Sequence, residues 1–183
     1  MNVVNNSVNI ARQNYFSLFS LEPGFQLDKQ QLEGQYKKLQ SKYHPDRFAS
    51  ANDQERREAM QITSIVNDAF ETLRSPLSRS AYLLELQGIE AENHQQSDLD
   101  TEFLMQQMQL RVTLEEEAEA ENIDAIEALK AKTEIELQTL YQDFEKSLHE
   151  GQLQSAKVIF HKCQFAEKLL TEINHVEEKL LDY

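Results

Sequence analysis

Apolar residues recur every three or four positions along most of this chain, which is the spacing of helices with one buried face. The spacing predicts a short helix from about Asn14, a second helix ending near Tyr43, and a third helix from about Asp53. Asp28 is placed to cap the second helix, with Gln31 completing a capping box three residues later. The second and third helices should pack antiparallel through two stripes: Leu32, Tyr36, Leu39 and Tyr43, and Ile62, Ile65, Val66, Ala69, Phe70 and Leu73.

Beyond Ser75-Pro76 the pattern predicts a short connecting helix, a polar loop at 91–97, and three long helices. The long helices should cover roughly 98–120, 123–149 and 152–181, with breaks at Asn122 and Gly151. Short connections between long helices indicate an antiparallel three-helix bundle. The expected fold class is all-α, which the scarcity of Gly and Pro also favours. The expected organisation is a flexible tail (1–13), a first helical module (14–75), a connection (76–96) and the bundle (97–183).

The first long helix has apolar residues on two sides rather than one. At ~100° per residue, one side carries Phe103, Gln107, Leu110 and Leu114, and the other carries Leu104, Met105, Met108 and Val112. Burial between two neighbours, or against the first module, would account for both sides. Alternatively, the second side is exposed and binds a partner, for which flexible methionines are well suited.

The last helix places Ile159, Cys163, Ala166, Leu170 and Ile173 on one narrow stripe. Cys163 is therefore expected to be a buried, inert thiol. Phe165 lies at the stripe edge, where it either widens the core or joins an exposed patch. We expect surface positions for the remaining histidines, which show no metal-ligand spacing: His94, His149, His161 and His175.

The charge is unevenly distributed. Residues 1–75 hold 9 basic and 9 acidic side chains, whereas residues 76–183 hold 9 and 23 and carry the whole net charge of −14. Such an acidic half repels phosphates and anionic lipid, so neither nucleic acid nor a membrane is an expected partner. No apolar run reaches the ~20 residues of a membrane span, and the first residues do not resemble a secretory signal. Together with a single cysteine, this favours the cytoplasm and leaves no Cys-rich metal site.

The tripeptide His44-Pro45-Asp46 lies between the second and third helices. Proline pushes the preceding residue out of the helical region, so His44 should end its helix in an exposed connection. Lys37, Lys38, Lys42 and Arg47 form a basic surface beside it, either as a solvated face or as a docking surface for an acidic patch. A histidine near a carboxylate is also a common acid–base pair. No nucleophile motif, phosphate-binding loop or metal set accompanies it, so we expect neither an enzyme nor a cofactor.

Three segments together resemble the J-domain, the co-chaperone module that switches on the ATPase of DnaK-type chaperones: Tyr15–Phe19, Lys42–Phe48 and Ile65–Leu73. Their order and spacing match that family. The resemblance implies that His44, Pro45 and Asp46 stimulate the partner's ATPase. It also implies that the lysines of the preceding helix help to dock the partner.

The second half resembles the HscB family of iron–sulfur cluster co-chaperones, in three segments: Ser75–Leu84, Phe103–Met105 and Glu177–Tyr183. This resemblance implies an L-shaped, bacterial-type protein without the zinc segment of eukaryotic relatives, here expected to be a monomer. It implies an HscA-type ATPase and an IscU-type scaffold as partners. By position, the scaffold surface is Leu104, Met105, Met108 and Phe165, with Glu116 as an acidic neighbour.

Two positions where that family can carry acids are Gln109 and Val112 in this chain. The resemblance therefore implies an intact apolar part of the scaffold surface, and it leaves open whether Gln109 and Val112 weaken the electrostatic part. Two alternatives stay open: a J-domain co-chaperone with a different basic client, and a structural helical protein that self-associates through the second apolar side.

Overall fold

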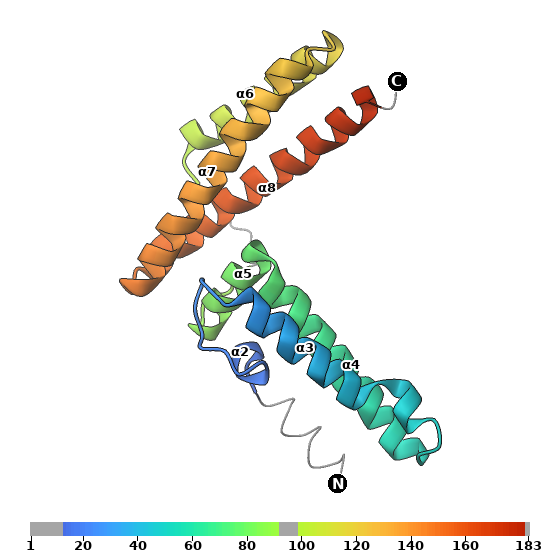
Figure 1. Ribbon diagram of the computed structural model, residues 1–183. Helices are drawn as coiled ribbons and strands as arrows, with labels where there is room; N and C mark the ends of the chain where they lie inside the picture. Colours follow the sequence, from blue (N-terminus) through green and yellow to red (C-terminus); the bar gives the residue numbers. More distant parts are fainter. Residues whose placement is uncertain (1–12, 92–98, 182–183) are drawn as a thin grey trace. The chain divides into compact units, whose positions relative to one another are not determined.

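The computed structural model describes residues 13–91 and 99–181, and in these residues the regular structure is entirely helical. The chain divides into two compact units, Met1–Leu83 and Leu84–Tyr183, whose helices are labelled in Figure 1. The expected tail up to residue 12 and the predicted loop from residue 92, with His94, lie outside the described residues.

The first unit is built on a pair of antiparallel helices. Asn14 caps α2 (Tyr15–Leu18), and α3 (Lys29–Tyr43) lies beside α4 (Asp53–Arg74) in Figure 1. The apolar stripes predicted for α3 and α4 face one another and α2. The largest fully buried side chains of this core are Phe16, Phe19, Leu32, Ile62, Val66 and Leu73.

Direct contacts set the register of α3 against α4. The Tyr36 ring stacks on Phe70 with 3.9 Å between centroids, and the Tyr36 hydroxyl donates to Asn67 Oδ1 at 3.1 Å. Further along, the Thr63 hydroxyl donates to the carbonyl of Tyr43 at 3.0 Å. Tyr36 contacts Asn67 and Phe70, whereas Tyr43, which is later in α3, contacts Thr63, which is earlier in α4. The two helices are therefore antiparallel, as predicted.

The helix caps confirm one prediction and correct another. Asp28 caps α3 by accepting from the backbone of Gln31 at 3.0 Å. The Gln31 side chain does not return to complete the predicted capping box, because its Nε2 donates to the Ser20 carbonyl at 2.7 Å. Ser20 has a left-handed φ of 57°, which turns the chain after α2 and leaves that carbonyl within reach. A capping box occurs instead at the start of α4, between Asn52 and Glu55.

The second unit is an antiparallel three-helix bundle, entered through α5 (Pro76–Leu86), which carries the boundary between the units. Its helices are α6 (Thr101–Glu119), α7 (Ile123–His149) and α8 (Leu153–Leu181). The predicted breaks are confirmed: Asn122 caps α7, and Gly151 takes the positive φ of 71° that favours glycine after a helix. The bundle core contains Leu114, Ile126, Leu169 and Ile173, flanked by the half-buried Leu110, Leu129, Val176 and Leu180.

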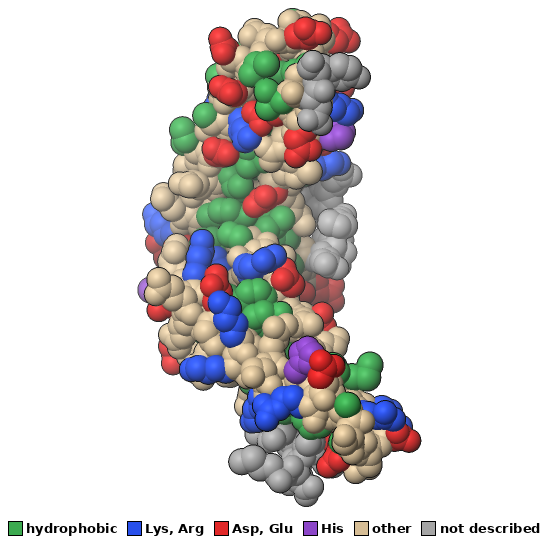
Figure 2. All heavy atoms as spheres, turned by 45° about the vertical axis from the view of Figure 1, so that its right-hand side comes forward, with side chains coloured by type: hydrophobic (Ala, Val, Ile, Leu, Met, Phe, Trp, Pro, Cys, Tyr) green, Lys and Arg blue, Asp and Glu red, His purple; other side chains and the backbone are tan. Residues whose placement is uncertain are grey.

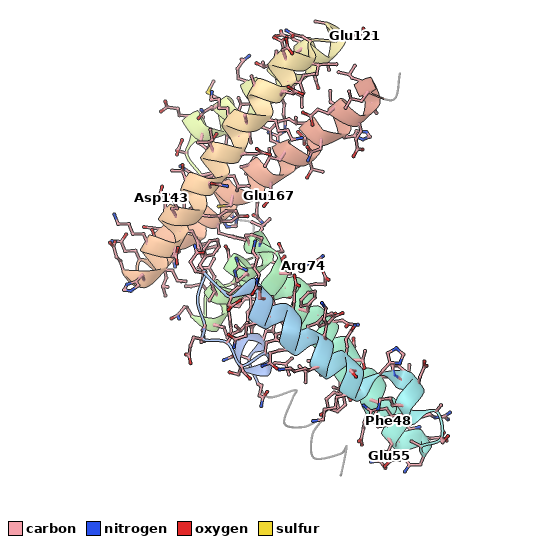
Figure 3. The ribbon with its side chains drawn as sticks, in the orientation of Figure 1. Phe48, Glu55, Arg74, Glu121, Asp143 and Glu167 are labelled. Carbon is pink, nitrogen blue, oxygen red and sulfur yellow. The ribbon has the colours of Figure 1, made fainter. Side chains whose placement is uncertain are left out.

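Polar pairs fix the helix directions in the bundle. Lys130 of α7 contacts Glu177 of α8 at 2.5 Å, and the Tyr141 hydroxyl donates to Glu167 at 2.8 Å, so α7 and α8 are antiparallel. The hydrogen bond that Lys130 donates to the Glu177 carboxylate raises the pKa of Lys130, so this lysine remains charged. Figure 3 labels Glu167 on α8 and Asp143 on α7.

The buried face of α8 is broader than the predicted stripe. Phe160 and Leu169 are buried beside Cys163, whereas Ile159 and Leu170 are only half-buried. The expectation that His161 is a surface residue is wrong, since only 6% of it is exposed. A helix that packs against two neighbours buries more than one row of side chains, and His161 lies on the widened face. Its Nδ1 is 3.0 Å from Gln164 Oε1. His149 and His175 are exposed, as predicted.

The buried thiol yields a prediction. Burial raises the pKa of Cys163 to about 12, well above the value of about 8.5 for a thiol in an unfolded chain. The folded chain therefore favours the neutral thiol, and stability should fall as the pH rises above the unfolded value. At pH 8 an aromatic disulfide reagent should leave the native protein unmodified and label one thiol in denaturant.

A matched control is Gln154→Cys, which adds a thiol at an exposed position of the same helix and should react at once without denaturant. Rapid labelling of the native wild-type chain would contradict the burial of Cys163.

Candidate functional sites

The connection after α3 is organised by His44-Pro45-Asp46. His44 leaves the helical region with φ −57° and ψ 132°, and Pro45–Phe48 then form a short 3-10 helix. The Asp46 backbone N–H donates to His44 Nδ1 at 3.3 Å, so the imidazole caps this turn. Accepting that bond requires a neutral ring with its proton on Nε2. The prediction that His44 ends its helix is confirmed.

The Asp46 carboxylate is exposed to solvent rather than buried in an ion pair with His44. Its Oδ2 lies 3.6 Å from His44 Nδ1, and the two side chains are 91% and 57% exposed. The ion pair needs a protonated ring, whereas the backbone bond needs the same nitrogen unprotonated. The two contacts therefore exclude one another, and the 91% exposed carboxylate of Asp46 is accessible to an external cation.

Basic side chains gather around this turn. Lys37, Lys38 and Lys42 are exposed on α3, and Lys42 Nζ lies 5.0 Å from the centre of the Tyr43 ring. Arg47 Nη1 donates to the Ser41 carbonyl at 3.1 Å and ties the turn back to α3. On the face shown in Figure 2, basic side chains lie near a histidine with an acidic neighbour.

The turn occupies one end of the α3–α4 hairpin. Figure 3 labels Phe48 and Glu55 at this end and Arg74 at the opposite end of α4. The tripeptide thus lies at one end of the helix pair with Lys42 in the adjacent last turn of α3, whereas Lys37 and Lys38 lie nearer the middle of that helix.

The two apolar sides of α6 have different environments. Phe103 and Gln107 are buried, at 7% and 2% exposure, whereas Met105 and Met108 are 66% and 68% exposed. Val112 is 44% exposed. The second apolar side of α6 could have been buried or exposed, and at Met105, Met108 and Val112 it is exposed.

Phe165 connects α8 to α6 through an aromatic contact. It is half-buried, and its ring meets Phe103 edge-on with 5.7 Å between centroids. At ~100° per residue, Leu104 lies between Phe103 and Met108 around the helix. Leu104 is half-buried, so the contact places Phe165 near the border between the buried and exposed sides of α6. Glu116 is exposed further along the same helix.

Two further residues hold the start of α6. The Phe103 backbone N–H donates to Asp100 Oδ1 at 2.6 Å, and this bond lowers the pKa of Asp100. Lys162 Nζ lies 3.7 Å from the Asp100 carboxylate and 5.0 Å from the centre of the Phe103 ring. Sequence reasoning missed both residues. Asp100 was recognisable as a cap before an apolar run, whereas the pairing of Lys162 depends on the register of two separate helices.

Among the described residues, no three His, Cys, Asp or Glu side chains are grouped so as to hold a metal ion. Within the same ranges, no helix combines the length and the apolar character needed to span a membrane.

Comparisons with known proteins agree with this architecture. The DnaJ domain family matches residues 14–82, and the family described as the HSCB C-terminal oligomerisation domain matches residues 99–174. The co-chaperone protein HscB of Proteus mirabilis is 40% identical over 171 residues, covering 92% of this chain and 98% of the relative. The co-chaperone protein HscB homolog of Aeromonas hydrophila is 40% identical over 170 residues, covering 92% and 99%.

Solved structures of HscB proteins have a similar fold. The structure of chaperone HscB from Vibrio cholerae has a TM-score of 0.84 at 37% identity, covering 92% of this chain and 99% of that chain. The crystal structure of human co-chaperone protein HscB has a TM-score of 0.81 at 28% identity, covering 91% and 83%.

The fold and the exposed His44-Pro45-Asp46 turn define a J-domain protein, a class whose partner is an Hsp70-type chaperone. The similarity along the whole length is more specific, and the chain belongs to the HscB family of co-chaperones, which serve iron–sulfur cluster assembly and are not enzymes. The predicted family and the predicted all-α fold are both confirmed.

Proposed function

We propose that the chain binds an IscU-type iron–sulfur scaffold, brings it to an HscA-type ATPase of the DnaK family, and stimulates ATP hydrolysis there. The supporting observation is that two exposed surfaces of different chemistry lie on two separate compact units. Joining two binding modules in one chain raises the local concentration of the client at the ATPase. The proposed setting is the bacterial cytoplasm, where ATP is available, and the proposed active form is a monomer.

At the ATPase, each residue of His44-Pro45-Asp46 has a distinct proposed role. Pro45 has a fixed φ and ends α3, so that the turn is presented in one conformation. His44 caps the turn and offers its Nε2–H, while the exposed Asp46 carboxylate pairs with a cationic group of the ATPase. Buried in the complex, such a charge-assisted contact is stronger than it is in water.

The proposed docking surface is Lys37, Lys38, Lys42 and Arg47, which would face an acidic patch on the ATPase. Exposed charges of this kind mainly raise the association rate and set orientation. Their contribution should weaken with ionic strength, because the Debye length is only about 8 Å in physiological salt.

The proposed scaffold surface is Leu104, Met105, Met108 and Phe165, with Glu116 beside it. The exposed methionines of α6 offer apolar area that adapts to the shape of a partner. The edge-on contact with Phe103 restricts the Phe165 ring, so less side-chain freedom is lost when the scaffold binds.

Replacing His44 tests the proposed role of the tripeptide. His44→Gln keeps a polar side chain but removes the imidazole that caps the turn. Steady-state ATP hydrolysis by the HscA-type partner should then remain near its unstimulated rate. His175→Gln changes another exposed histidine and should stimulate as wild type does. Full stimulation by His44→Gln would show that the tripeptide does not have this role.

Truncating the proposed scaffold surface tests the second half of the proposal. Met105→Ala and Phe165→Ala should each weaken scaffold binding by ~1–4 kcal/mol in titration calorimetry if they are central anchors. Stimulation of the ATPase by the co-chaperone alone should change little, since His44-Pro45-Asp46 is untouched. Met60→Ala removes an exposed methionine of the first unit and should leave the affinity unchanged. Unchanged calorimetry for both α6 and α8 variants would reject the assignment.

Sedimentation velocity and a lysate pull-down address the two alternatives. A monomer is expected, although the name of the matched C-terminal family mentions oligomerisation. A dimer that dissociates on Met105→Ala would instead support self-association through the exposed side of α6. Failure to recover an IscU-type scaffold, with a basic protein bound in its place, would support a different client.

A further inference from the structure

Methionine side chains are unusually accessible in this chain. Methionine is among the residue types that folded proteins most often bury, yet Met60, Met105 and Met108 are 62%, 66% and 68% exposed. The fourth methionine, Met1, lies outside the described residues. Since Cys163 is buried, these three methionines are the exposed sulfur-containing side chains of the part that the structure describes.

Two of these methionines lie together on the exposed side of α6. Met105 and Met108 are three residues apart, which separates them by about 60° around the helix axis and by about 4.5 Å along it. Their neighbours Gln106 and Gln109 are exposed and uncharged, whereas Met60 belongs to α4 in the first unit. A molecule bound on this side of α6 therefore meets two thioethers at once.

A thioether reacts with a peroxide in a balanced two-electron step. The sulfur lone pair attacks one oxygen of hydrogen peroxide, the O–O bond breaks, an S–O bond forms, and water leaves. The product, methionine sulfoxide, is polar where the thioether was apolar. Sulfoxide reductases reverse the step: two thiols become a disulfide, and the oxygen leaves as water.

The cysteine of this chain is unsuited to react with peroxide. Cysteine oxidation follows thiolate character and exposure, whereas burial raises the pKa of Cys163 to about 12. Thioether oxidation needs no deprotonation, so access to the sulfur governs it. The exposed methionines are therefore the side chains of the described residues through which peroxide can act most directly.

We propose that Met105 and Met108 form a reversible oxidation site, at which peroxide converts both thioethers to sulfoxides and thereby releases the IscU-type scaffold. This inference rests on the proposed scaffold function. Each sulfoxide oxygen would have to lose its water when an apolar partner surface covers it, which costs free energy. His44-Pro45-Asp46 contains no sulfur, so the oxidised chain would still stimulate the ATPase but would no longer bring the scaffold to it.

The test uses the full-length chain, which is oxidised with hydrogen peroxide and then separated from it before purified scaffold is added. Peptide mass spectrometry should find one added oxygen on Met105 and one on Met108, formed at similar rates in the native chain and in denaturant. Titration calorimetry should show scaffold binding weakened about tenfold or more. Treatment with the two sulfoxide reductases, one for each sulfoxide epimer, should restore the affinity.

Two variants assign the loss of affinity to these sulfur atoms. Met105→Leu/Met108→Leu removes both thioethers, so its affinity for the scaffold should be the same before and after peroxide, whatever the starting value. Met60→Leu removes the exposed thioether of the first unit and should lose affinity on oxidation as wild type does. A loss that persists in the double leucine variant would place the effect of peroxide elsewhere and overturn the inference.

The remaining outcomes separate the inference from the proposed function. If Met105→Ala weakens scaffold binding whereas complete oxidation does not, the scaffold surface stands and the oxidation site is rejected. Strong protection of Met105 and Met108 from peroxide in the native chain would also reject it. If neither truncation nor oxidation changes the affinity, the proposed scaffold surface itself is wrong. Affinity that stays low after the reductases have removed both oxygens would reject reversibility.

Discussion

A helix can bury only those sides of its circumference that meet a neighbour, and this constraint governs the second unit. α6 carries apolar side chains on two sides, but α7 and α8 cover only the side that contains Phe103, Gln107 and Leu114. The methionines on the other side stay in solvent at a free-energy cost of roughly 25 cal/mol per Å² of apolar surface left in water. A partner that covers this side recovers that free energy, so the exposed stripe favours association.

In the first unit the corresponding constraint is local and comes from Pro45. Its ring excludes His44 from helical geometry, so the turn between α3 and α4 begins at a defined residue. The contacts that hold α3 against α4, such as the stacking of Tyr36 on Phe70, lie within the hairpin. His44, Pro45 and Asp46 therefore do not pack in the core, and their side chains are exposed and accessible to another protein.

Much of this fold follows from local rules, and the exceptions depend on long-range packing. Periodicity predicted the long helices, and the breaks at Asn122 and Gly151 reflect the preferences of single residues. The burial of His161 and the pairing of Lys162 with Asp100 were not predicted, because both depend on the register in which the helices of the bundle pack against one another. The two-sided pattern of α6 indicated the exposed stripe, but only the packed bundle shows which side is covered.

The single thiol of this chain, Cys163, is unsuited to bind iron or an iron–sulfur cluster. Iron and its clusters are held by thiolates, and Cys163 is the only cysteine in the sequence. With a pKa of about 12 in a buried position, it remains protonated and out of reach of a solvent-borne ion. A co-chaperone of iron–sulfur cluster assembly thus provides no reactive thiolate from this chain, and this chain does not compete as a thiolate ligand for the metal.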